Sequence, residues 1–215
     1  MKRMLFAAVL TALLIVPCLA TAALLPEHSR IAVMDLGGRK GFTTNDVNAR
    51  NLEKAATDYV IEALTDSGRF DVIDKVLVED FLAAERISTV GIIDPERAQR
   101  IGNALGVRYI VYGNVDGVGA DTGGVNVVGS GVEVHNARAV LIIRVMDVAS
   151  GDIITMAKGT GKSKSSKVRG GTEALGFVTV GTKKISQAAV HNAIKKAAYD
   201  AADKIVGDLY GTAKG

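Results

Sequence analysis

The chain has 215 residues, of which 48% are hydrophobic and 23% are charged. Its 26 basic and 23 acidic residues give a formal net charge of +3 at pH 7, and Lys2 and Arg3 supply two of the basic residues. This near balance does not favour a nucleic-acid-binding protein, whose domains carry a strongly basic surface. The hydrophobic content is sufficient for the core of one globular domain.

The first 22 residues have the pattern of a secretory signal peptide. Lys2 and Arg3 precede an apolar run over residues 4–16, and Ala20, Thr21 and Ala22 form a small-residue cleavage site. The run is shorter than the roughly 20 residues that a membrane-spanning helix needs. We therefore expect cleavage before Ala23, export to the periplasm, and one folded domain over residues 23–215.

Cys18 is the only cysteine and lies inside this predicted signal. Its removal would leave the mature chain with no disulfide and no thiol nucleophile. Lipidation of Cys18 is the alternative, but it requires a small residue just before the cysteine, where this chain has Pro17. We expect an unlipidated periplasmic protein, and association with the outer membrane stays open.

Strand and helix patterns alternate in the first half of the mature sequence. The apolar run at residues 30–36 predicts a central strand, and the glycines that follow predict a loop. From residue 45, apolar positions recur every three or four residues until Gly68, which predicts a helix ended by glycine. The remaining elements of this half are a strand at 69–74, a helix at 76–86, and a helix at 96–105 that begins after Asp94 and Pro95.

The second half predicts consecutive strands and one long helix. Strands are expected at residues 107–115, 138–148 and 153–157, with a hairpin turn at 149–152. Apolar residues occupy both alternation sets of the second of these, as a strand covered on two faces requires. A helix over residues 184–210 completes an α/β fold, a mixed β-sheet with packed helices.

Two β-hairpin insertions are expected in this domain, at about residues 118–136 and 159–181. The first is rich in glycine and valine, and the second begins with closely spaced cations. Unpaired strand edges recruit other strands, so either segment could contact a neighbouring protein. The candidate interaction residues are Val125, Val127, Val132, Val134, Lys162, Lys164, Lys167 and Arg169.

Four stretches, at residues 30–34, 64–74, 105–113 and 139–154, carry a resemblance to a known family. The most specific is the long strand Leu-Ile-Ile-Arg-Val-Met-Asp-Val followed by Ala-Ser-Gly-Asp-Ile-Ile, placed after a glycine-rich insert. The sequence resembles the curli production assembly/transport (CsgG-like) secretion channel family. This resemblance implies an α/β periplasmic domain whose inserted hairpins, in true channels, assemble into an outer-membrane barrel.

The second insert departs from what a channel needs. A membrane strand of about 9–11 residues alternates apolar and polar side chains. Here Lys162 and Lys164 would point to one face and Lys167 and Arg169 to the other, so either face would expose cations to lipid at roughly 2–4 kcal/mol each. We expect a shortened periplasmic member, and Phe42, in the loop where the family narrows its pore, is interpreted as a loop anchor.

No catalytic, cofactor or metal motif stands out. Gly159 to Ser163 lacks the spacing of a nucleotide-binding loop because Met156 occupies the position of its first glycine. The three histidines are too widely spaced in sequence to suggest a metal site. We expect a non-enzymatic envelope protein that acts by oligomerisation or docking to other envelope proteins. The alternatives are a true outer-membrane secretion channel and a soluble regulator of an envelope enzyme.

Overall fold

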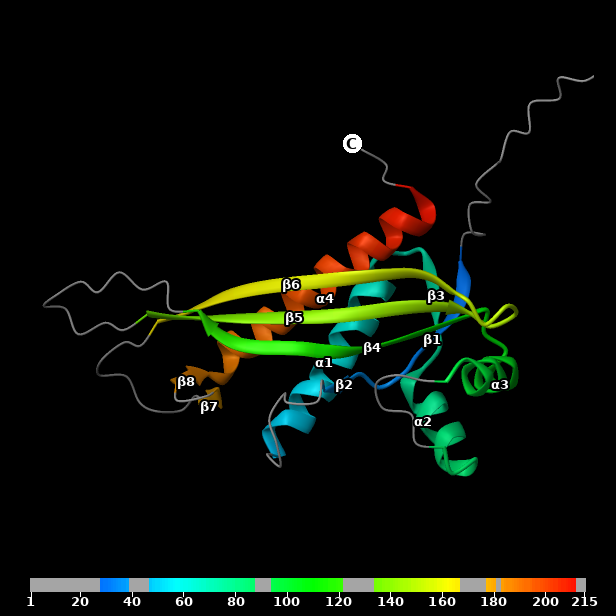
Figure 1. The fold of residues 1–215 in the computed structure, drawn as a ribbon, viewed down its shortest axis with the longest axis horizontal. Helices are drawn as coiled ribbons and strands as arrows, with labels where there is room; N and C mark the ends of the chain where they lie inside the picture. Colours follow the sequence, from blue (N-terminus) through cyan, green and yellow to red (C-terminus); the bar gives the residue numbers. More distant parts are fainter. Residues whose placement is uncertain are drawn as a thin grey trace, which may run out of the picture.

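The computed structural model describes residues 28–38, 47–87, 94–121, 134–166, 177–180 and 183–211. Within them a six-stranded mixed sheet forms the centre of the molecule (Figure 1). The sheet order is β3 (Phe70–Val72), β1 (Ser29–Val33), β4 (Tyr109–Asp121), β5 (Val134–Asp147) and β6 (Ile153–Ser166), with β2 (Gly37–Gly38) also paired to β4. The predicted α/β fold with a mixed sheet is confirmed.

Parallel and antiparallel pairing divide this sheet between its two halves. The strands β3, β1, β2 and β4 pair in parallel, whereas β4, β5 and β6 form antiparallel neighbours. The strand expected at residues 30–36 ends at Val33, and Gly37 and Gly38, expected in a loop, pair with Asn114 and Val115. A second, two-stranded sheet joins β7 (Phe177–Val180) to β8 (Lys183–Ser186).

Helices cover the two faces of the large sheet unequally. The helices α1 (Val47–Asp66) and α4 (Gln187–Tyr210) pack on one face and bury a core that runs from β1 to β6. In Figure 1 both lie behind β4, β5 and β6. A smaller core on the other face lies under α2 (Lys75–Ala84) and α3 (Pro95–Leu105). No helix within the described ranges is long and apolar enough to cross a bilayer.

The helix boundaries follow the signals in the sequence. Gly68 and Gly106 both have a φ of 63°, the left-handed conformation that ends a helix at little cost for glycine. The side chain of Asp74 caps α2 by accepting a hydrogen bond from the Val76 N–H at 2.9 Å. Asp94 occupies the corresponding position of α3, where Pro95 begins the helix and the carboxylate makes no capping hydrogen bond.

The three antiparallel strands are longer than the sequence pattern indicates. β4 continues to Asp121, β5 begins already at Val134, and β6 runs to Ser166. The described ends of both expected insertions therefore continue the central sheet. The sequence does not predict these strand extensions because they are rich in glycine and polar residues, which are depleted in ordinary strands.

The prediction that both faces of β5 are covered is wrong for half of the strand. Leu141, Ile143 and Val145 are fully buried against α1 and α4, as expected. On the opposite face Met146 is buried in the smaller core, but Ile142 is only half-buried. The reason is tertiary, since the core under α2 and α3 extends along β5 no farther than Met146.

Candidate interaction surface

The β5–β6 register brings the two predicted interaction segments together. Val134 is opposite Ser166, and Lys164 is opposite Asn136 at the same end of the sheet. Lys162 and Lys164 are both exposed on β6. Val134 begins β5, but its side chain is outside the described part of the structure. The other predicted residues also lie outside the described residues: Phe42, Val125, Val127, Val132, Lys167 and Arg169.

The packing of α4 determines which side chains of β6 are exposed. Gly159 and Gly161 are buried against α4, and a Cβ atom on either would overlap a backbone carbonyl oxygen, that of Ala197 or Ala193 respectively. The helix thus rests directly on the strand backbone. The alternate residues Lys158, Thr160, Lys162 and Lys164 consequently point to the other face.

That other face is a surface that the sequence only partly revealed. We call it the open face, because α1 and α4 lie on the opposite side of the sheet and the core under α2 and α3 does not extend across it. Neither residues 136–146 nor residues 153–164 contain an acidic residue. The open face consists of Arg138, Val140, Ile142 and Arg144 of β5 and Met156, Lys158, Thr160, Lys162 and Lys164 of β6.

The charged residues that β5 and β6 contribute to the open face are all cations. Arg138 lies directly opposite Lys162 in the β5–β6 register, and like charges in that position repel. The buried Nη1 of Arg144 has no hydrogen-bond partner among the described residues. Burial raises the pKa of the neighbouring Tyr112 hydroxyl, and the positive charge of Arg144 acts against that rise. The open face therefore favours a negatively charged partner.

The outer edge of β6 is occupied by side chains of α4. Lys204 donates to the Lys158 carbonyl oxygen at 2.8 Å, and Lys196 donates to the Lys162 carbonyl oxygen at 3.3 Å. Between them, the Thr160 N–H donates to Asp200 at 2.8 Å. Strand addition over residues 158–162, which the sequence suggested, would have to displace these contacts. The face of β6 is thus a better candidate than its edge.

We expect Asp200→Asn to weaken this edge contact and to change its pH dependence. Burial acts to raise the pKa of Asp200, but hydrogen bonds from Lys204 and the Thr160 N–H outweigh it and hold the pKa below its ordinary 3.8. A carboxylate with a lowered folded-state pKa contributes stability above its unfolded pKa, and this contribution is lost as pH falls through the folded value.

The expected loss in Asp200→Asn is about 1 kcal/mol of unfolding free energy at pH 7, because the amide keeps the Thr160 contact but not the charge. Urea unfolding at pH 7 and pH 3 measures it. The variant should differ less from the parent at pH 3. Asp203→Asn on the exposed side of α4 is the control, and equal losses in the two variants would contradict the edge contact.

Histidine and carboxylate side chains do not gather into a metal site within the described residues. His28 Nδ1 lies 3.8 Å from Asp71, and His191 Nδ1 lies 3.4 Å from the Tyr59 hydroxyl. Lys195, which pairs with Glu62 at 2.8 Å, joins α4 to α1 close to His191. The His191 and Lys195 contacts hold α4 to α1, and the His28 contact joins the start of β1 to β3, so a packing role accounts for all three.

The sequence also matches a known family over almost its whole length. The family profile described as "Curli production assembly/transport component CsgG" matches residues 19–213. The chain belongs to the CsgG family. The resemblance inferred from the sequence is thereby confirmed, and the mixed sheet with its packed helices is a CsgG-like domain. No curated protein sequence matches the chain.

Several solved structures are similar to the chain at low sequence identity. The LpoB C-terminal domain from Salmonella enterica is 21% identical, with a TM-score of 0.43 and coverage of 62% of this chain and 82% of that one. Lipoprotein GNA1162 from Neisseria meningitidis is 15% identical, with a TM-score of 0.46 and coverage of 64% and 84%. The PelC dodecamer from Paraburkholderia phytofirmans is 12% identical, with a TM-score of 0.45 and coverage of 88% and 92%.

Proposed function

We propose that this chain is a non-enzymatic protein of the cell envelope that acts through protein contacts made by its open face. The contacts are with further copies of the chain or with other envelope proteins. The predicted signal peptide supports a location in the periplasm or at the inner surface of the outer membrane. Membership of a family described by assembly and transport supports a role in assembly rather than in catalysis.

The observation that carries this proposal is the chemistry of the open face. Exposed Met156 and half-buried Val140 and Ile142 form an apolar centre among five cations, which are Arg138, Arg144, Lys158, Lys162 and Lys164. A surface that combines apolar side chains with charge of one sign is suited to docking a protein of the opposite charge.

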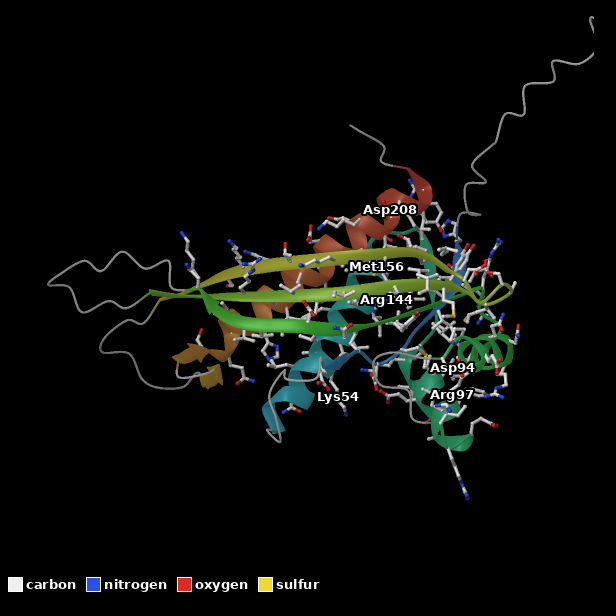
Figure 2. All side chains as sticks on the ribbon, viewed as in Figure 1. Lys54, Asp94, Arg97, Arg144, Met156 and Asp208 are labelled. Carbon is white, nitrogen blue, oxygen red and sulfur yellow. The ribbon has the colours of Figure 1, made fainter. Side chains whose placement is uncertain are left out.

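Photo-crosslinking in intact cells tests the proposal. A photoreactive residue is placed at 156 or 164 on the open face, and at 54 on α1 as the control. Figure 2 shows Met156 on β6 and Lys54 on α1, well separated. We expect the tagged protein in the periplasmic fraction, with discrete crosslinks from 156 and 164 to itself or to one envelope protein identified by mass spectrometry.

Retention in the cytoplasm, or crosslinks from position 54 equal to those from 156 and 164, would contradict the proposal. Measuring the molecular mass of the mature protein in solution, with and without detergent, distinguishes the proposed docking role from the channel alternative. An oligomer that is heat-resistant, requires detergent and conducts ions in bilayers would favour a secretion channel. A protein that stays in solution without detergent would favour the docking role.

A further inference from the structure

Exposed large apolar side chains gather at two places in the described structure. Ile153, Ile154 and Met156, at the start of β6, expose 51%, 38% and 60% of their surface. Val76 and Leu77, in the first turn of α2, expose 56% and 59%. Groups of exposed apolar side chains are candidate interaction surfaces.

The group on α2 is held rigidly in its exposed position. Val78, the next residue, is buried in the smaller core. Lys75 anchors the start of the helix through Asp58 at 2.8 Å and Asp35 at 3.6 Å. The helix therefore cannot turn Val76 and Leu77 inward without losing these contacts. Their exposure belongs to the folded state.

The two groups carry opposite charge. Glu79 and Asp80 are exposed and lie three or four residues after Val76 and Leu77, which places them on the neighbouring turn of α2. On the sheet, Arg144 lies directly opposite Met156, and Lys158 is the next outward-facing residue of β6. Figure 2 shows Arg144 and Met156 beside each other on the two strands. One surface is apolar with an acidic border, and the other is apolar with a basic border.

We propose that α2 of one copy docks on the open face of another copy, with Val76 and Leu77 against Met156 and with Glu79 and Asp80 facing Arg144 and Lys158. This inference rests on the proposed function, and it names the partner as a second copy of this chain. The carboxylates would lie beside the positive charges that border Met156, those of Arg144 and Lys158. Apolar contact supplies the affinity, and the charges select the orientation.

The two surfaces are different, so the contact joins unlike patches. Such a contact propagates into a ring or a filament, unless a twofold axis forms it twice within a dimer. In either case a copy that has lost one patch still offers the other. This property makes the proposal testable by mixing variants.

Leu77→Ser and Met156→Ser each remove one apolar centre from an exposed position, so folding should be retained. Sedimentation equilibrium of the full mature chain measures association. We expect each variant alone to associate at least ~10-fold more weakly than the parent, since a central apolar contact commonly contributes that much. Mixed in equal amounts, the two should form a pair, because α2 of Met156→Ser docks on the intact open face of Leu77→Ser.

Charge reversal provides a second measurement. Asp80→Lys and Lys158→Glu should each weaken association, and an equimolar mixture of the two should recover it, less so at high salt. Lys54→Glu, a reversal on α1, is the matched control and should associate as the parent does. Equal association of all these variants with the parent would overturn the inference, as would mixtures that recover nothing.

The failure of this inference differs visibly from a failure of the proposed function. A parent that stays monomeric at every concentration overturns docking between copies. Crosslinks from position 156 to a different envelope protein would then leave the proposed function in place. Retention of the chain in the cytoplasm would contradict the proposed function itself, whatever the purified protein does.

Discussion

Ile143→Asp is expected to unfold the domain. Ile143 is 0% exposed, lies in the larger core, and is opposite Gly113 on β4. A carboxylate there would lose its hydration, and the packing contacts of the isoleucine side chain would also be lost. Together these two effects should lower the free energy of unfolding by about 5 kcal/mol or more. A domain of this size has a total stability of roughly 5–15 kcal/mol. Far-UV circular dichroism during heating and urea titration measures the loss.

Lys164→Asp is the matched control for this substitution. It introduces the same carboxylate on the neighbouring strand, but at an exposed position of the open face. Its melting temperature should stay close to that of the parent, because solvent-facing substitutions usually change stability by less than about 0.5 kcal/mol. If Ile143→Asp had the same melting temperature as Lys164→Asp and the parent, the assignment of β5 to the core would be wrong.

The sequence predicts the helices well because their signals are local. The spacing of apolar residues up to Gly68 predicts α1, and Gly68 takes the left-handed conformation expected of a helix stop. Gly106 similarly marks the end of α3, whose helix was predicted to reach residue 105. Each of these signals acts within one turn of the chain, so no knowledge of distant residues is needed to interpret it.

The extent of β6 is not predictable in the same way. Residues 158–166 contain two glycines and several lysines and serines, a composition typical of a loop. The glycines belong to a strand because α4, about 40 residues later, packs on them without room for a side chain. The need for glycine here comes from tertiary packing, so the local sequence pattern does not predict it.

The candidate surface was predictable in part. Cation spacing identified Lys162 and Lys164, whereas Arg144 lies in a strand predicted to be covered on both faces, and no sequence signal singled out Met156 in the next strand. A signal for the α2 group was present, since residues 76–82 hold five apolar residues, more than one helix stripe can bury. Which of the five remain exposed depends on how α2 lies on the sheet.

Gly161→Val is expected to separate α4 from β6 and to cost about 3 kcal/mol of unfolding free energy. A Cβ atom at Gly161 would overlap the Ala193 carbonyl oxygen and come within 2.6 Å of the Ala197 nitrogen. Both are backbone atoms, so no rotamer change relieves the overlap, and α4 must move. Its movement would also pull Lys196 away from the edge of β6, where it contacts the Lys162 carbonyl oxygen.

Gly119→Val on β4 is the matched control, because a Cβ atom there meets nothing within 4 Å. Valine suits an extended strand better than glycine does, so this variant should be as stable as the parent or slightly more stable. Urea unfolding compares the two variants, and amide hydrogen exchange should be faster along α4 in Gly161→Val alone. Equal stability of both variants would mean that α4 does not rest on the backbone of β6, and the outward direction of Lys158, Lys162 and Lys164 would lose its physical basis.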